Sequence, residues 1–378
     1  MTLAAPPGSA QLRKDPSAPW RYLDLVLLFC AGTIATLGVL TVYSATKGSG
    51  PIADTSAAQR QALFVVVGLV VMGITALIDY ELLRHWARLI YGGMVVLLAG
   101  VLVVGTEVKG IRAWFLLGPI QLQPSELAKV GLVIVLAWYL ARQPAELPLT
   151  SVATALGLSG VLMGLILLQP DLGTMLVFVV TTMGMLLVGG IRPKHMVVLL
   201  LIGAIGVTAI LSSGTLEDYQ TDRLKVFVDP EGVDEQVRYN LAQAQIAISS
   251  GGMLGQGWGE GSQTQLDFVP EQQTDFIFTA VGEELGFVGA GLLLLLYGVM
   301  CMRILRTAQL ARDRFGMLLA TGALCVLAFH VFQNIGMSMG IMPITGIPLP
   351  LMSAGGSSTL AWFVLLGLVL NVRMRRYR

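Results

Sequence analysis

Residues 269–300 form one long segment, which reads "VPEQQTDFIFTAVGEELGFVGAGLLLLLYGVM". Its second half carries no charged residue, and the apolar run is long enough to cross the roughly 30 Å hydrocarbon core of a membrane. Its first half nevertheless contains Asp275, Glu283 and Glu284. Carboxylates in a membrane helix must face protein, water or a partner charge. We therefore expect a membrane helix with a charged, protein-facing or water-facing end.

The rest of the 378-residue chain has the same character. Hydrophobic residues make up 55% of it and charged residues only 12%, with a mean hydropathy of +0.75, outside the range of ordinary soluble domains. Apolar runs begin near residues 23, 60, 89, 125, 151, 171, 195, 274, 316 and 356. The prediction is an all-α polytopic membrane protein: a ten-helix transmembrane bundle with a long structured outward loop, residues 214–274, between helices 7 and 8.

The distribution of charge predicts the orientation. If the N-terminus is inside, the cytoplasmic loops hold most of the Lys and Arg residues, together with the C-terminal "RMRRYR". We expect both termini in the cytoplasm, residues 1–20 as a disordered tail, 21–372 as the membrane domain and 373–378 as a basic tail. Net charge is only +1, and the loop 214–274 is acidic, which argues against nucleic acid as a partner.

The charged end of the opening stretch is the first candidate site. Thr274 suits a helix N-cap and would place Asp275 in the first turn, where the helix dipole favours a carboxylate. Asp275 then either complements that dipole or reacts with a substrate. Glu283 lies on nearly the same face, about 12 Å deeper, and Glu284 points elsewhere. For both glutamates we expect structural contacts inside the bundle.

Two further stretches combine polar residues with interrupted apolar sequence. In residues 109–140, Glu126 and Lys129 lie three residues apart on one helical face, which suits either an ion pair at the membrane edge or a site. In residues 334–367, three prolines interrupt the helix, so this backbone must pack on protein or line a cavity. The histidines His85, His195 and His330 show no metal-ligand or nucleophile spacing, and we interpret them as structural.

Four quoted motifs carry a resemblance: "QPSELAK" (123–129), "LLQPDLGT" (167–174), "GSQTQLDFVPEQQTDFIFTAVGEELGFVG" (261–289) and "NIGMSMGIMPITGIPLPLMSAGGSS" (334–358). Together they resemble the SEDS family (shape, elongation, division and sporulation) over roughly residues 20–372, the elongation branch more than the division branch. The resemblance implies a peptidoglycan glycosyltransferase that polymerises lipid II at the outer face of the bacterial cytoplasmic membrane. It also implies a class B penicillin-binding protein as transpeptidase partner, with other membrane proteins of the elongation machinery.

The resemblance also implies site residues. Asp275 occupies the position of the catalytic aspartate, and Glu126 with Lys129 match a functionally important pair. Candidate substrate-binding residues, several of them cations for the pyrophosphate, are Lys109, Arg112, Arg223, Lys225, Ser357 and Ser358. The sequence departs from the family pattern at Ala113, often Arg, and at Ala354, so Arg112 would have to act from a register shifted by one residue. No organic cofactor is implied; Mg²⁺ or Mn²⁺ could assist, without identified ligands.

The chemistry supports one essential carboxylate. A pyrophosphate leaving group needs cations or N–H donors but no acid, unlike the leaving group in glycoside hydrolysis. Asp275 is therefore predicted to be the base that activates the acceptor 4-hydroxyl, with inversion, and it needs a partly desolvated site to be basic enough. Two alternatives remain open at this point: a flippase for lipid-linked precursors, and a noncatalytic scaffold of the cell-wall machinery.

Overall fold

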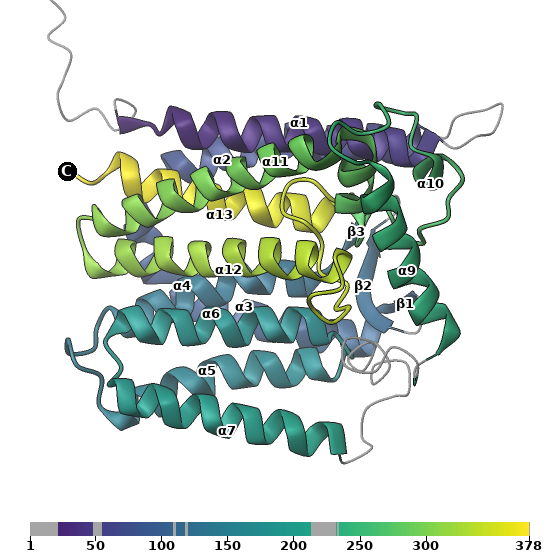
Figure 1. Ribbon diagram of the computed structural model, residues 1–378. Coiled ribbons are helices and arrows are strands. Elements are labelled where there is room, and N and C mark those ends of the chain that lie inside the picture. The colour runs from purple at the N-terminus through teal and green to yellow at the C-terminus, as the bar shows by residue number, and fades with distance from the viewer. Residues whose placement is uncertain are drawn as a thin grey trace, which may run out of the picture.

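The computed structural model describes residues 22–47, 55–108, 111–117, 120–212, 232 and 234–377 (Figure 1). The predicted tail 1–20 and the residues Lys109, Arg223 and Lys225 lie outside this part of the chain. The long helices are α1 (Leu25–Lys47), α2 (Ser56–Leu77), α3 (Tyr80–Val104), α4 (Pro124–Leu140), α5 (Leu149–Leu167), α6 (Leu172–Gly189), α7 (Pro193–Ser212), α11 (Ile277–Gln309), α12 (Arg314–Ser338) and α13 (Gly356–Met374).

Within the described residues, eight of these helices are long and apolar enough to cross a membrane. The two others are α4, which has 17 residues, and α7, whose shorter apolar part is Pro193–Gly206. The polytopic helical membrane fold is therefore confirmed, while the count of ten spans is not matched by length and hydropathy alone. At 1.5 Å per residue α4 is only about 25 Å long, which suits a helix enclosed by others.

The core of the bundle is built around α4, α12 and α13. The helix α4 is buried along nearly its whole length and packs against α3, α5, α6, α12 and α13. By contrast α2, α3 and α7 expose many large apolar side chains, such as Val66, Val103 and Leu201. A contiguous apolar exterior of this kind is what a lipid-facing surface requires.

A small antiparallel sheet lies at one end of the bundle and was not anticipated. Its strands are β1 (Thr106–Val108), β2 (Ile111–Leu117) and β3 (Ile120–Leu122), in the order β1-β2-β3. Glu107 pairs with Arg112, and Phe115 with Leu122. The chain passes from β3 through Gln123 directly into Pro124, which suits the first position of α4. The sheet thus fixes where α4 begins.

The described part of the loop 214–274 is ordered, as predicted. It contains α9 (Glu235–Ser250) and the short α10 (Ser262–Gln265). Asp234 caps α9, because its side chain accepts from the Gln236 backbone N–H at 2.7 Å. The helix α9 packs against α10, α11 and α12. These elements lie with the sheet at the same end of the bundle (Figure 1).

The structure of α11 explains why residues 269–300 contain two neighbouring glutamates, Glu283 and Glu284. It has 33 residues, about 50 Å, and is kinked at Gly286, whose φ is 65°. Glu283 lies before the kink and is fully buried; it accepts from the backbone N–H groups of Gln263 and Thr264 at 2.7 and 2.9 Å. Glu284 accepts from Ser44. Both glutamates therefore make structural contacts, as expected, but with the α10 segment and α1.

The opposite end of the bundle holds the first residues of α1 and the end of α13 (Figure 1). There the buried Asp24 accepts from Arg303 at 2.9 Å and pairs with Arg373 at 3.1 Å. Arg375, in the segment predicted to be a basic tail, is buried and donates to the carbonyls of Ala76 and Leu77 at the end of α2. Arginines thus satisfy free carbonyls at this end.

Candidate functional site

A cavity of about 600 Å³ lies at the end of the bundle that carries the sheet and α9. Its walls come from β2, the start of α4, the start of α6, residues 271–275, α12 and the irregular segment before α13. Its lining includes the predicted residues Glu126, Lys129, Asp275, Ser357 and Ser358. The structure therefore brings together predicted residues up to 232 positions apart in the chain. Residues 334–367 were expected to pack on protein or to line a cavity, and residues 344–348 and 354–358 line this one.

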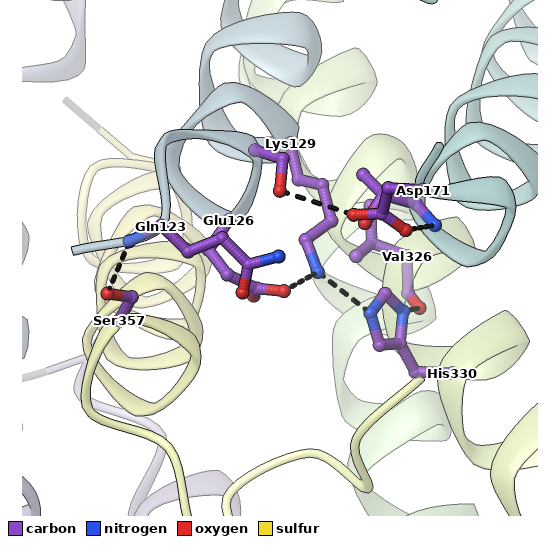
Figure 2. Close-up of polar contacts among 9 residues, drawn as sticks. Gln123, Glu126, Lys129, Asp171, Val326, His330 and Ser357 are labelled. Carbon is purple, nitrogen blue, oxygen red and sulfur yellow. Dashed lines mark hydrogen bonds and ion pairs between the residues drawn. The ribbon is translucent and has the colours of Figure 1, made fainter. Parts of the chain in front are cut away.

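The charged pair on α4 is buried and has a third member. Lys129 Nζ lies 2.7 Å from Glu126 Oε1, with both side chains nearly inaccessible. The same Nζ lies 3.0 Å from His330 Nε2, while His330 Nδ1 lies 2.8 Å from the Val326 carbonyl. Because a carbonyl only accepts, Nδ1 carries the ring proton and Nε2 accepts from the lysine. Figure 2 shows Lys129 between Glu126 and His330.

His330 was interpreted from the sequence as structural, and the structure places it in the cavity wall. The available signal was its position: an ionisable side chain inside an apolar helix is a functional candidate by default. Its neighbour Trp362 packs edge-on at 4.9 Å between ring centroids. Since Lys129 uses two of its three N–H donors on Glu126 and His330, one donor remains for a group in the cavity.

Asp171 is a second lining residue that sequence reasoning did not single out. It caps α6, because its Oδ1 accepts from the Thr174 backbone N–H at 2.9 Å, and its Oδ2 lies 3.5 Å from the Ser125 hydroxyl (Figure 2). The Asp-x-x-Thr pattern after a proline was a readable N-cap signal. The contact between Ser125 and Asp171 links the start of α4 to the start of α6 at the cavity wall.

Asp275 lies in the cavity wall but not in a helical first turn. The helix α11 begins at Ile277, and Thr274 is not its N-cap. Instead Thr274 and Asp275 both donate their backbone N–H to the Glu271 carbonyl, at 3.1 and 3.0 Å, in a turn before the helix. The first-turn placement was therefore wrong, because this local turn competes with helix initiation. Asp275 is half-buried, beside Glu271 in the lining.

The backbone around Asp275 is held by α12. The buried Asn334 donates to the carbonyls of Asp275 and Ile347, both at 2.7 Å. The Ala354 N–H donates to the Gln273 carbonyl at 2.9 Å. These bonds join residues 271–275 to the irregular segment 341–355, so that the two walls of the cavity form one unit.

The segment 341–355 is irregular, as its prolines predict, and its polar groups are satisfied by protein. Gln61 of α2 donates to the Ser353 carbonyl at 3.1 Å and accepts from the Gly355 N–H at 3.2 Å. Tyr297 donates to the Pro350 carbonyl at 2.6 Å. Backbone that lacks helical bonds at the membrane edge needs such partners. These bonds fix the backbone conformation of the segment where it forms the cavity wall.

The serine and arginine residues predicted to bind substrate lie in different places relative to the cavity. The buried Ser357 accepts from the Gln123 N–H at 3.0 Å and donates to the Gln121 carbonyl at 2.9 Å, so it joins β3 to α13. Arg112 is exposed, pairs with Glu107 at 3.3 Å and is not among the cavity residues, whereas Ala113 and Trp114 are. Arg112 therefore lies outside the cavity lining in this structure.

A resident metal ion does not fit the described residues. Within those ranges no three side chains of His, Cys, Asp or Glu are grouped so that they could hold one. Of the cavity carboxylates, Glu271 and Asp275 lie on one segment, Asp171 is engaged as the cap of α6, and Glu126 is paired with Lys129. We therefore derive no chemical step through a cation.

Comparisons with known proteins agree with this architecture. The chain is 35% identical to the peptidoglycan glycosyltransferase MrdB of Escherichia coli over 357 residues, 94% of each chain. A subunit of a peptidoglycan synthase complex that coordinates polymerisation and crosslinking superposes with a TM-score of 0.80 at 34% identity, covering 94% of this chain and 99% of that one. The rod shape determining protein RodA of Thermus thermophilus superposes with a TM-score of 0.72 at 32% identity, covering 95% and 99%.

The sequence profile of the FtsW/RodA/SpoVE cell cycle proteins matches residues 24–378, which is nearly the whole described bundle together with the cavity motifs. The chain therefore belongs to the FtsW/RodA/SpoVE family, the SEDS family that its motifs resemble.

Proposed function

We propose that this protein is a peptidoglycan glycosyltransferase that polymerises lipid II into glycan strands during cell elongation, with Asp275 as the base. The observation that carries the proposal is the convergence of Asp275, Lys129 and Glu126 on one cavity of about 600 Å³. The names of the relatives supply the reaction class. A cavity of this size is in the range that holds part of a large ligand.

Asp275 acts on the acceptor sugar in this mechanism. Its carboxylate removes the proton from the acceptor 4-hydroxyl as that oxygen attacks the anomeric carbon of the donor. The new glycosidic bond forms on the face opposite the departing group, and the bond to the pyrophosphate breaks with its electron pair. Asp275 is half-buried in the cavity lining, where an acceptor sugar in the cavity can meet its carboxylate.

Lys129 acts on the leaving group. Its ammonium is buried, and its two printed contacts are with Glu126 Oε1 and His330 Nε2. The third N–H can donate to a pyrophosphate oxygen as negative charge develops there. Glu126 and His330 hold the ammonium in place without touching the reacting atoms, so they are positioning residues.

The proposal includes a crosslinking partner. The synthase complex that resembles this chain coordinates polymerisation with crosslinking, so we expect a class B penicillin-binding protein to supply the transpeptidase. In this proposal lipid II is used at the outer face of the membrane, and the positive-inside distribution of arginines supports an orientation with the cavity end outside and both termini inside.

The test is polymerisation of labelled lipid II by the purified protein, with and without its penicillin-binding partner, read as glycan chains on a gel. The variant Asp275→Asn should form no polymer while keeping its fold. A matched control is Asp267→Asn: Asp267 is exposed in the same segment, outside the cavity lining, and its φ of 54° suits Asn. Polymer from Asp275→Asn at near-native rates would refute the role of Asp275, and no polymer from the native pair would favour a flippase or scaffold.

A further inference from the structure

A second cavity lies at the other end of the bundle, away from the proposed active site. It has a volume of about 380 Å³ and is formed by the first turns of α3 and the residues around the end of α4. Its lining residues are Glu81, Arg84, His85, Arg88, Trp138 and Arg142. Three guanidinium groups and one carboxylate make the cavity strongly basic.

Only one of the three arginines of this cavity has a carboxylate partner among the described residues. Arg84 lies 3.6 Å from Glu81. In the described parts of the chain neither Arg88 nor Arg142 has an ion pair; instead their guanidinium carbons lie over the Trp138 ring, 5.4 and 4.2 Å from its centroid. Partial burial, with the charges of Arg84 and Arg88, lowers the pKa of Arg142. Like charges held together in this way are stabilised by a bound anion.

The geometry suits phosphate in particular. Guanidinium groups present paired N–H donors that match phosphate oxygens, and two of these groups are oriented by stacking on one indole ring. Lysines would offer no such fixed fork. The positive charge and the guanidinium geometry of the cavity thus favour a phosphate group over an uncharged polar ligand.

The surface beside the cavity is apolar. Leu82, Trp86 and Leu89 on α3 are each at least half exposed, and their spacing of four and three residues aligns them along one helical face. On the same turns Arg84 and Arg88 lie on another side of the helix, about 150° around from this face, and the lining residue His85 lies between the two sides. A ligand with a phosphate at one end and hydrocarbon at the other would satisfy both surfaces, whereas a soluble phosphate would use only the cavity.

We propose that this basic cavity binds the phosphate headgroup of an anionic phospholipid whose acyl chains lie along Leu82, Trp86 and Leu89. Basic pockets between transmembrane helices at the positively charged side of a membrane protein are suited to such headgroups. The site is separate from the cavity that holds Asp275 and does not depend on the reaction proposed for it.

The test uses native mass spectrometry of the purified full chain in mild detergent. Dioleoyl phosphatidylglycerol and dioleoyl phosphatidylcholine, which share acyl chains, are added separately and the bound lipids counted. We expect the native chain to retain one phosphatidylglycerol selectively. Arg88→Gln with Arg142→Gln should weaken that binding roughly thirtyfold, because each arginine beside an anionic headgroup contributes about fivefold. Arg88→Lys with Arg142→Lys keeps both charges but loses the guanidinium fork and the stacking on Trp138, so it should restore only part of the binding.

A matched control removes two positive charges at the same end without touching the cavity. Lys194→Gln with Arg306→Gln does this, since both residues are exposed and absent from the lining, and it should bind phosphatidylglycerol like the native chain. Equal retention of the two lipids by the native chain would overturn the proposal. So would an equal loss in both double variants, or displacement of the lipid by millimolar glycerol phosphate, which would indicate a soluble ligand.

Discussion

At the scale of single residues, the pair of Glu126 and Lys129 is defined by its burial. Both side chains are almost fully enclosed, so removing one charge leaves the other uncompensated at about 3–5 kcal/mol. We expect Lys129→Met to lower the thermal unfolding midpoint more than Glu126→Gln/Lys129→Met does, although the double variant loses more groups. Scanning fluorimetry in detergent measures this. Losses that simply add in the double variant would contradict the coupling.

Asn334 offers a second test at this scale. Asn334→Leu removes both bonds to the Asp275 and Ile347 carbonyls, which costs about 1–3 kcal/mol and frees the Asp275 backbone. We expect polymerisation per folded molecule to fall about tenfold or more through kcat, since misplacement by about 1 Å costs up to a hundredfold.

The control for Asn334 is Asn371→Leu. Asn371 is also buried and donates to two carbonyls, those of Thr75 and Ile78, but at the far end of the bundle. It should lose similar stability and keep its activity per folded molecule. Equal activity in the two variants would remove Asn334 from the set of positioning residues.

At the scale of elements, the kink in α11 depends on one glycine. A side chain at Gly286 would have to adopt a φ of 65° with its Cβ only 2.3 Å from the Gly255 nitrogen. The kink also lets Gln256 and Gly257 donate to the Glu283 and Glu284 carbonyls, at 2.9 and 3.1 Å. Backbone strain of this kind costs about 1–3 kcal/mol before the clash is counted.

We therefore expect Gly286→Ala to lower the unfolding midpoint by several degrees or prevent folding. Gly291→Ala, five residues further along the same helix, meets no atom within 4 Å and should be neutral or slightly stabilising, by up to about 1 kcal/mol. Thermal unfolding of both variants in the same detergent is the measurement. Equal midpoints would show that α11 does not need its kink.

The elements also show what sequence can predict. Long apolar runs predicted the helices, because burial in lipid or against protein leaves a strong local pattern. The loop 214–274 was predicted to be structured, and its described part contains α9 and α10. The sheet β1–β3 was missed because its longest strand has seven residues and pairs only with short neighbours. The kink was missed because Gly286 looks like any glycine in an apolar helix, and its φ is set by the contact with residues 252–257.

At the scale of the whole molecule, Asp24 joins α1, α11 and α13 through Arg303 and Arg373. Asp24→Asn removes the only charge between two arginines in this contact, and we expect a loss of about 3 kcal/mol. Glu146→Gln breaks the exposed pair with Arg192, where water replaces the partner, and should change the midpoint little. Thermal unfolding distinguishes them; a similar small change in both would show that Asp24 does not hold the three helices together.

The candidate site is a whole-molecule feature, and the sequence predicted it unevenly. Motifs identified Asp275, Glu126 and Lys129, because each stretch carries its own signal. No local signal linked His330 to Lys129, since 201 residues separate them and the contact exists only after α4 and α12 pack. Likewise Arg112 was adjacent in sequence to a lining residue, yet its strand position directs it to Glu107.

The large sequence separation between residues that contact one another determines when these contacts can form during synthesis on the ribosome. Lys129 emerges with its partner Glu126 three residues earlier, so α4 can enter the membrane as a neutralised helix. Asp24 emerges among the first residues described, and its partners follow 279 and 349 positions later. His330 and Asp275 also arrive late. The nascent chain therefore has no complete cavity until α12, the segment before α13 and the first residues of α13 have been translated, so the proposed reaction cannot begin on a partly made protein.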